Sequence, residues 1–198
     1  IQIQVLCPMK KGIAGVENLN AALQDAVNPK TKDKRELKIG ALVLRQGDKV
    51  IHTVNNYSLE WVDSDMSAGS GVYNGDIGYI TDVNLTEPSV TVVFDDGRRA
   101  KYTQGILDQI RPAYAISVHK SQGCEFPVVA LALQRGNYMI MTRNLLYTAV
   151  TRAKNMAVIV GAKDTIGNMV KNTYCVRRYS LLSDFIEQEY YRMHRQMP

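Results

Sequence analysis

The segment Val128–Leu133 is apolar without interruption, and it constrains the fold more than any other stretch of the chain. A strand that is apolar on both sides is typical of a parallel sheet covered by helices on both faces. Ala157–Val160 is a second such run, and Gly161 ends it. Ile1–Leu6 alternates apolar and polar residues, and Tyr114–Val118 adds another short strand. We therefore expect one α/β domain containing all four segments, with Ala157–Val160 buried.

Helical spacing accompanies these strands. The first predicted helix has an apolar face at positions i, i+3, i+4 and i+7, made by Leu19, Ala22, Leu23 and Ala26. This helix should end near Asn28–Pro29, because the residue before a proline disfavours helical geometry. Residues 144–153 predict a second helix, and Leu181, Leu182, Phe185 and Ile186 predict a last amphipathic one.

The middle of the chain has a different texture. Between Gly47 and Arg111, short runs rich in β-branched residues alternate with turn signals, of which Asp95–Gly97 is a strong hairpin signal. Short strands at this spacing predict a small β-barrel. Asp63–Gly71 is expected to be a loop, and Lys30–Lys38 a solvated linker of mixed charge. The predicted organisation is an α/β domain of residues 1–44 and 112–198, interrupted by a barrel of residues 45–111.

Composition narrows the setting of the protein. The chain has 198 residues, a charged fraction of 22% and a net charge of +5, which admits a polyanionic partner. No stretch approaches the roughly 18 consecutive apolar residues of a membrane span. The three cysteines are far apart and form no CxxC pair, which argues against disulfides or a zinc site and favours the cytoplasm. Because the first residue is Ile, we expect a piece of a longer chain.

Functional groups concentrate in the connection Ser117–Glu125 between two predicted strands. It contains a hydroxyl, an imidazole, an amine, an amide, a glycine and a carboxylate. A single His or Gln there is better explained as part of a hydrogen-bonded connector. The whole set indicates a binding site, since loops between rigid strands carry function disproportionately often.

Arg152 is the second candidate. It follows Leu145 and Thr148 at i, i+3 and i+7, so we expect it on the helix at the edge of the buried face. A planar, permanently charged guanidinium suits the negative charge of a γ-phosphate. Taken alone, Arg152 is better explained as an ordinary surface arginine.

Several segments, taken in order, resemble a known family. The chain is similar to RecD-like superfamily 1 DNA helicases. The matching segments are Val5–Gly12 for motif IV, Gly47–Val50, Asn55–Tyr57 and Asn74–Gly78 for the inserted Src-homology-3-like barrel, Tyr114–Pro127 for motif V and Leu145–Lys154 for motif VI. The resemblance covers nearly the whole chain. It implies an α/β, RecA-like motor domain of the P-loop NTPase type, the second of two, carrying that barrel.

The resemblance also assigns roles. Arg152 would be the arginine finger, and Lys11, where relatives often carry Arg, a second cation near the γ-phosphate. The nucleotide would further contact Gln122, Gly123 and Glu125, with Glu125 near the ribose. Single-stranded DNA would be held by Ser117, His119, Lys120, Asn55 and Asn56. Barrel aromatics could stack on bases, although most should fill the core. The family moves 5′ to 3′ along one strand.

The phosphate-binding half of such an enzyme is missing from the sequence. No G-x-x-x-x-G-K-[ST] occurs, and Asp95–Asp96 is better explained as a turn than as a magnesium ligand pair. ATP with magnesium would therefore be held mainly by an N-terminal RecA-like domain of the parent chain, and this chain alone should be inactive. No metal site is expected here.

Other interpretations share many of these motifs. One is a non-catalytic nucleic-acid-binding adaptor, and another is the motor part of a relaxase-helicase. A Pif-type helicase fits Glu125–Pro127 and Leu145–Thr148 less well. The sequence leaves open whether subunits of a nuclease complex accompany the parent.

Overall fold

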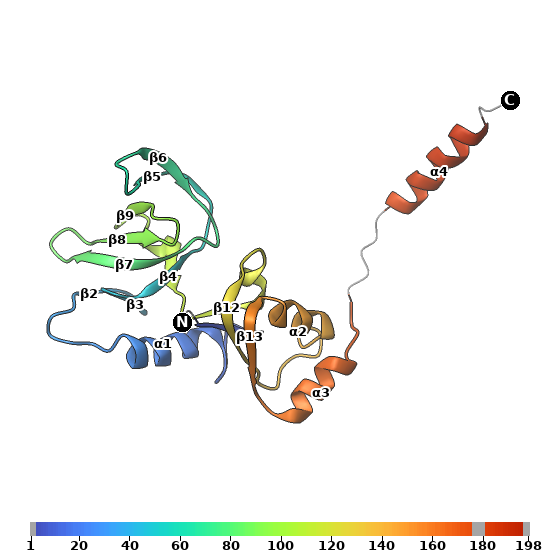
Figure 1. Cartoon of the computed structure of the whole chain (residues 1–198), viewed down its shortest axis with the longest axis horizontal. Coiled ribbons are helices and arrows are strands. Elements are labelled where there is room, and N and C mark those ends of the chain that lie inside the picture. The colour runs from blue at the N-terminus through green and yellow to red at the C-terminus, as the bar shows by residue number, and fades with distance from the viewer. Residues whose placement is uncertain (1–2, 176–180, 196–198) are drawn as a thin grey trace.

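The computed structural model describes residues 3–175 and 181–195, and two β-sheets dominate it (Figure 1). The α/β part comprises β1 (Ile3–Cys7), α1 (Val16–Val27), β11 (Ala115–Ser117), the 3-10 helix η2 (Val118–Ser121), β12 (Phe126–Ala132), α2 (Arg143–Val150), β13 (Ala153–Val160) and α3 (Lys163–Lys171). The barrel part comprises β4 (Lys49–His52), β5 (Asn56–Val62), β6 (Ala68–Val72), β7 (Ile77–Asn84), β8 (Ser89–Phe94), β9 (Arg99–Thr103), the 3-10 helix η1 (Leu107–Gln109) and β10 (Ile110–Pro112). Between them lies a hairpin of β2 (Glu36–Ile39) and β3 (Leu42–Arg45).

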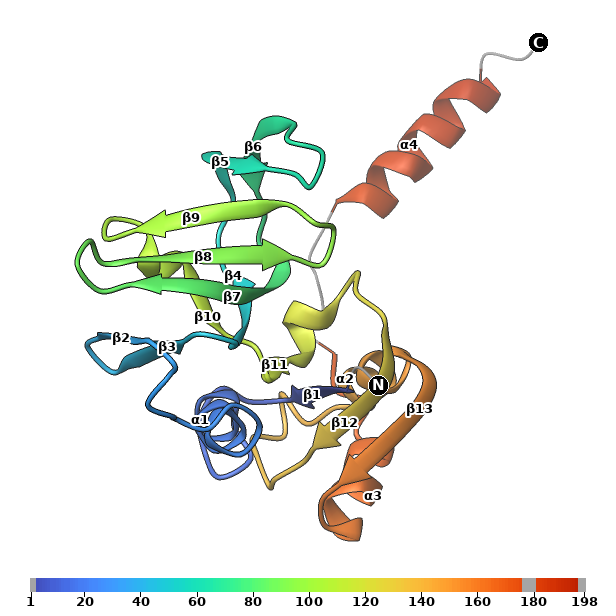
Figure 2. The same cartoon turned by 60° about the vertical axis from the view of Figure 1, so that its left-hand side comes forward.

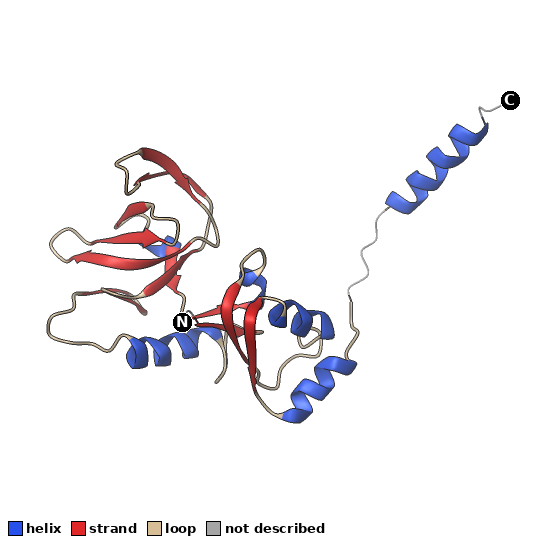
Figure 3. Cartoon of the chain, in the orientation of Figure 1, coloured by secondary structure: helices blue, strands red, loops and turns tan. Residues whose placement is uncertain are grey.

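The α/β sheet has the order β11-β1-β12-β13, and all its strands are parallel. One face carries a continuous apolar core in which Val129 and Leu131 of β12, and Leu133 directly after it, pack with Leu145 of α2 and Met169 of α3. Figure 3 shows α1, α2 and α3 beside this sheet. The expected α/β domain is therefore confirmed.

The expected burial of Ala157–Val160 is wrong. β13 is an edge strand, and most of its side chains are exposed, including Met156, Val158 and Val160. Side chains on both faces of β13 are exposed from Lys154 to Val160, so neither face of this edge strand is covered in the part of the chain that the structure describes. The apolar run therefore predicted the strand correctly, but it did not predict whether other elements bury that strand.

The buried face of α1 only partly overlaps the expected one, since Leu19 and Leu23 are half-buried. Ala22 and Ala26 are exposed, whereas the polar Asn20 and Gln24 are buried. Asn20 exchanges hydrogen bonds with the backbone of Ala115, one of 2.8 Å to its carbonyl and one of 2.9 Å from its N–H. Strand β11 is a sheet edge, and its backbone groups need partners. A polar face thus seats α1 against the edge of the sheet.

The barrel is a seven-stranded antiparallel sheet with the order β10-β4-β7-β8-β9-β5-β6 (Figure 2). The predicted hairpin at Asp95–Gly97 joins β8 to β9, and Gly97 takes a positive φ of 92° that favours glycine. Leu37 and Leu44 pack into the barrel core. The hairpin of β2 and β3 therefore packs with the barrel. The expected boundary at residue 45 and the expected linker Lys30–Lys38 had placed most of it outside the barrel.

The stretch Asp63–Gly71, expected to be a loop, contains part of a strand. β6 pairs with β5, and Gly69 lies opposite Trp61. A side chain at Gly69 would bring its Cβ within 2.5 Å of the Trp61 ring, so glycine is needed for this close approach. The glycine at position 69, which reads as a loop signal in the sequence, is therefore explained by packing under a large ring.

Helix α4 (Leu182–Arg195) confirms the last predicted helix and stands apart from the rest of the chain in Figure 1. Its apolar residues Leu182, Phe185 and Ile186 are exposed. Among the described residues, no helix is both long and apolar enough to cross a bilayer.

His52 makes the stability of the barrel depend on pH. It is fully buried, its Nδ1 lies 2.9 Å from the Tyr102 hydroxyl, and its Nε2 has no partner among the described residues. Burial is the main cause that lowers the pKa of His52 below its usual value. The unfolded chain therefore binds a proton at a higher pH than the folded barrel does, so stability present above about pH 6.5 is lost as the pH falls.

We expect the unfolding free energy to decrease below about pH 6.5 by at most about 1.4 kcal/mol per pH unit from this group. Urea unfolding between pH 7.5 and 5, followed by the fluorescence of the single tryptophan, Trp61, would measure it. The variant His52→Gln, which cannot titrate, should flatten this slope. An equal slope in His52→Gln would assign the pH dependence to other groups.

Candidate functional site

The segment Ser117–Glu125 is ordered by its own hydrogen bonds. The Ser117 hydroxyl accepts a 3.3 Å bond from the Lys120 N–H, and the buried Ser121 donates a 2.7 Å bond to the Val118 carbonyl. Gly123 takes a positive φ of 86°, which a glycine adopts without strain. A purely structural role as a hydrogen-bonded connector thus explains Ser121 and Gly123. It does not explain His119, Gln122 and Glu125, whose side chains are exposed.

Arg152 lies directly against this segment. Helix α2 ends at Val150, so Arg152 sits in the following turn and not on the helix as expected. Its half-buried side chain donates 3.3 Å from Nε to the Thr148 carbonyl and 3.2 Å from Nη1 to the Cys124 carbonyl. Two segments singled out separately in the sequence therefore meet at one place.

The backbone fixes this meeting. Phe126 N–H donates a 2.8 Å bond to the Arg152 carbonyl, which ties the start of β12 to the turn before β13. Beside it, Lys154 Nζ lies 3.3 Å from the Glu125 carboxylate, with both side chains largely exposed. Such a surface pair stabilises little. Sequence reasoning missed the pairing of Lys154 with Glu125. Its only local signal is that Lys154 lies two residues after Arg152, which is itself bonded next to Glu125.

A hollow of about 290 Å³ lies between η2 and α2. Its lining includes His119 and Gln122 on one side and Thr142, Leu145 and Thr148 on the other. The structure therefore places His119, expected to contact DNA, and Gln122, expected to contact the nucleotide, in the same hollow.

Ser117 and Lys120 lie at the carboxyl end of β11, away from Arg152. Partial burial lowers the pKa of Lys120, and the positive charges of Lys10 and Arg111 lower it further. Three cations from separate segments thus lie close enough to repel one another, an arrangement that an anionic phosphate would relieve. Sequence reasoning missed Lys10 and Arg111, because they are distant along the chain.

Lys11 is not brought to Arg152. It follows the carboxyl end of β1, whereas Arg152 precedes the amino end of β13, and these parallel strands place the two residues at opposite ends of the sheet. The Lys11 carbonyl accepts a 3.0 Å bond from Gln134. The role of Lys11 near a phosphate stays a prediction.

Asn55 and Asn56 shape the barrel. The Asn55 side chain accepts a 2.9 Å bond from the Asn74 N–H. The Asn56 side chain accepts bonds of 3.1 and 3.0 Å from the N–H groups of Ser58 and Leu59 and donates one of 2.9 Å to Gln109. The Asn56 amide and the Asn55 side-chain oxygen are thus used within the fold, and a role of both residues in DNA binding stays a prediction.

The barrel aromatics divide into two groups. Tyr102 is fully buried and Trp61 is half-buried, and both pack in the barrel core. Tyr57 and Tyr73 are exposed and lie edge to face, with ring centroids 5.9 Å apart. The second pair has free ring surface for a base. Across residues 3–175 and 181–195, no three His, Cys, Asp or Glu side chains group as metal ligands would.

The fold and this site define a class, the helicase motor region, in which a RecA-like α/β domain carries a small SH3-like barrel. The family model described as the ATP-dependent RecD-like DNA helicase SH3 domain matches residues 19–94. The model described as the UvrD-like helicase C-terminal domain matches residues 112–160.

Relatives agree with these models. An ATP-dependent RecD2 DNA helicase of Deinococcus radiodurans is 32% identical over 81% of this chain and 20% of its own length. The RecBCD enzyme subunit RecD of Mycolicibacterium smegmatis is 31% identical over 81% of this chain and 25% of its own length. The chain belongs to the RecD-like DNA helicases, and it spans only a fifth to a quarter of the length of these two relatives.

Solved structures share the fold. A Pif1 helicase from Bacteroides, in complex with ADP-AlF3 and ssDNA, superposes with a TM-score of 0.56 and 21% identity over 96% of this chain and 46% of that one. A Pif1 structure at forked double-stranded DNA gives a TM-score of 0.54 and 22% identity over 96% of this chain and 44% of that one. At this identity the likeness concerns the architecture.

Proposed function

We propose that this chain is the C-terminal part of an ATP-dependent 5′–3′ DNA helicase, in which it supplies the arginine finger and part of the single-strand track. The observation that supports this most directly is the contact of Arg152 with the Cys124 carbonyl inside the Gln122–Glu125 segment. Together with the bond to the Thr148 carbonyl, this contact holds the guanidinium beside the most polar connection of the sheet.

The residues present fit one wall of a nucleotide site. Arg152 keeps part of its guanidinium accessible, and Gln122 and Glu125 are exposed beside it. Arginine offers five donors in a rigid fork, which suits phosphate oxygens. ATP with magnesium, when bound, would supply the phosphoryl group whose transfer to water drives the cycle. The phosphate cradle and the magnesium ligands would come from an N-terminal RecA-like domain, because this sequence lacks the P-loop motif.

The opposite end of the sheet suits single-stranded DNA. Ser117 and Lys120 offer a hydroxyl and an amine there, and Lys10 and Arg111 add charge nearby. His119 adds an imidazole from the hollow that Gln122 also lines, between the two groups. Such groups bind the phosphate backbone without reading sequence. Closure of the cleft between two motor domains would move this grip along the strand, so nucleotide and DNA would be coupled through the sheet between them.

The variant His119→Ala tests the DNA half of this proposal. Its affinity for a fluorescent oligothymidine should fall about tenfold, the effect of losing one hydrogen bond to a charged phosphate. The melting temperature should not change, because His119 is exposed. Fluorescence anisotropy on this chain and on the parent protein would measure the affinity.

Gln122→Ala is the matched control, since Gln122 lines the same hollow but is assigned to the nucleotide. It should leave the DNA affinity intact. Unaltered DNA affinity in His119→Ala would make this histidine a structural residue and remove it from the track.

A further inference from the structure

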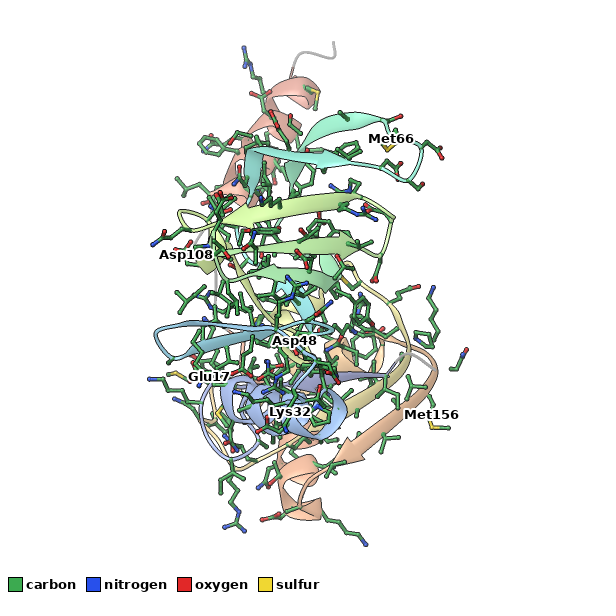
Figure 4. The ribbon with its side chains drawn as sticks, turned by 90° about the vertical axis from the view of Figure 1, so that its left-hand side faces the viewer. Glu17, Lys32, Asp48, Met66, Asp108 and Met156 are labelled. Atoms are coloured by element: carbon green, nitrogen blue, oxygen red, sulfur yellow. The ribbon has the colours of Figure 1, made fainter. Side chains whose placement is uncertain are left out.

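Asp48 carries a buried charge at the point where the chain enters the barrel. The residue precedes β4 directly, and its side chain is fully buried. Figure 4 shows it between α1 and the barrel. A carboxylate removed from water must find other donors, because an unsatisfied buried charge is strongly destabilising.

Both carboxylate oxygens of Asp48 have two donors. Oδ1 accepts 2.7 Å from Asn28 Nδ2 and 2.9 Å from the Tyr114 hydroxyl. Oδ2 accepts 2.5 Å from Gln24 Nε2 and 2.7 Å from the Arg45 N–H. All four donors are neutral, and no ion pair to Asp48 occurs within the described residues. Directional bonds and not charge attraction therefore hold this group.

The four donors come from separate parts of the chain. Gln24 lies on α1 and Asn28 caps its end, Arg45 ends the β2–β3 hairpin, and Tyr114 precedes β11. Burial, and then the neighbouring carboxylate of Asp48, raise the pKa of the Tyr114 phenol, so its hydroxyl remains a donor. One carboxylate thus joins the barrel entrance to the helix and to the edge strand of the α/β domain.

A second set of bonds closes the same joint. Lys49 Nζ donates 2.8 Å to Gln4 Oε1, and Gln4 Nε2 donates 3.1 Å to each of the Ala113 and Tyr114 carbonyls. The Ala113 N–H donates 2.8 Å to the Lys49 carbonyl, where the chain leaves the barrel. Apolar contacts tolerate sliding, whereas satisfied buried polar networks define one geometry. The joint is therefore built to fix an angle.

We propose that Asp48 is a positioning residue that locks the orientation of the barrel on the RecA-like domain. Tyr114 is three residues before Ser117, and α1 follows the loop that contains Lys10. The lock therefore sets the position of the barrel, with Arg111 on its strand β10, relative to Lys120 after the carboxyl end of β11. The consequence for DNA rests on the proposed function, whereas the lock itself does not.

The test is the distance between two spin labels, one on the barrel at Glu87→Cys and one on α3 at Lys163→Cys, in this chain with Cys124 and Cys175 replaced by serine. Both label positions are exposed. With Asp48 intact we expect one narrow distance distribution. In Asp48→Asn the distribution should broaden or shift, since an amide cannot accept from all four donors, and the melting temperature should fall by about 5–10 °C.

Tyr114→Phe keeps the charge and removes a single donor, so it should fold and broaden the distribution by less. Tyr79→Phe is the matched control, because the Tyr79 hydroxyl has no hydrogen bond to any described residue, and it should leave the distribution unchanged. A narrow, unshifted distribution in Tyr114→Phe and in any Asp48→Asn that folds would overturn the lock, even with a lower melting temperature. Single-strand affinity is measured separately: a chain that binds no DNA but loses its fixed distance in these variants contradicts the proposed function and supports the lock.

Discussion

Replacing Arg152 with alanine in the parent protein is expected to lower ATP turnover about a thousandfold or more, the usual contribution of an arginine finger. The guanidinium is tied to the Thr148 and Cys124 carbonyls, so its position beside Gln122–Glu125 is fixed before any nucleotide arrives. Such preorganised charge stabilises a transition state without reorganisation at the moment of reaction. Removing it should therefore act on turnover much more than on binding.

Steady-state phosphate release with saturating single-stranded DNA would measure this loss. Arg143→Ala is the matched control, because Arg143 is an exposed arginine at the other end of α2 and should leave turnover unchanged. Arg152→Lys keeps the charge but loses the planar fork, so it should recover only a small part. DNA affinity should remain nearly intact in all three variants. Full turnover in Arg152→Ala would exclude this residue from the mechanism.

This chain alone is expected to hydrolyse ATP no faster than a buffer control, with or without DNA. It offers one wall of a nucleotide site, and its sequence has no G-x-x-x-x-G-K-[ST] to hold the β- and γ-phosphates. An arginine finger without that cradle has no positioned phosphate on which to act. Phosphate release from the purified chain, with added oligothymidine, is the measurement. DNA-stimulated release above background would contradict the assignment of a missing half.

The same experiment on the parent separates the helicase from the adaptor. A helicase parent should show DNA-stimulated turnover that depends on Arg152. A non-catalytic adaptor that kept only the fold should show none, and it would bind DNA equally well with and without nucleotide.

Much of the fold followed from local sequence. The continuous run Val128–Leu133 and the alternation of Ile1–Leu6 predicted two strands of one parallel sheet, because period and apolarity report strands directly. Asp95–Gly97 predicted a hairpin, because a positive φ selects glycine. Which strands are buried by neighbouring elements was harder to predict. Ala157–Val160 is as apolar as a central strand, yet β13 lies at the edge, since strand order depends on long-range pairing.

The prediction of the buried face of α1 was wrong in part for a related reason. Apolar spacing favoured Ala22 and Ala26, but Asn20 and Gln24 are buried because they satisfy the edge of β11 and the Asp48 carboxylate. Polar residues with such specific partners outweigh small apolar ones, and no local pattern shows the partners.

The site was partly foreseeable. Motif resemblance predicted that Arg152 and Gln122–Glu125 lie at one site, and the bond from Arg152 to the Cys124 carbonyl agrees with this prediction. It also placed Lys11 near the γ-phosphate, and this role stays a prediction, because the parallel strands put Lys11 and Arg152 at opposite ends of the sheet. Lys10, Arg111 and Asp48 act across the joint between two domains, and only the folded chain shows such neighbours.

The most direct measurement is a crystal structure of the parent protein with ADP and a γ-phosphate mimic. We predict that the Arg152 guanidinium lies within about 3 Å of an oxygen or fluoride of the mimic, the range of a hydrogen bond. Glu125 should lie on the ribose side of the same nucleotide. An Arg152 side chain directed to solvent, with the mimic bound elsewhere, would contradict the claim that this chain completes an ATP site.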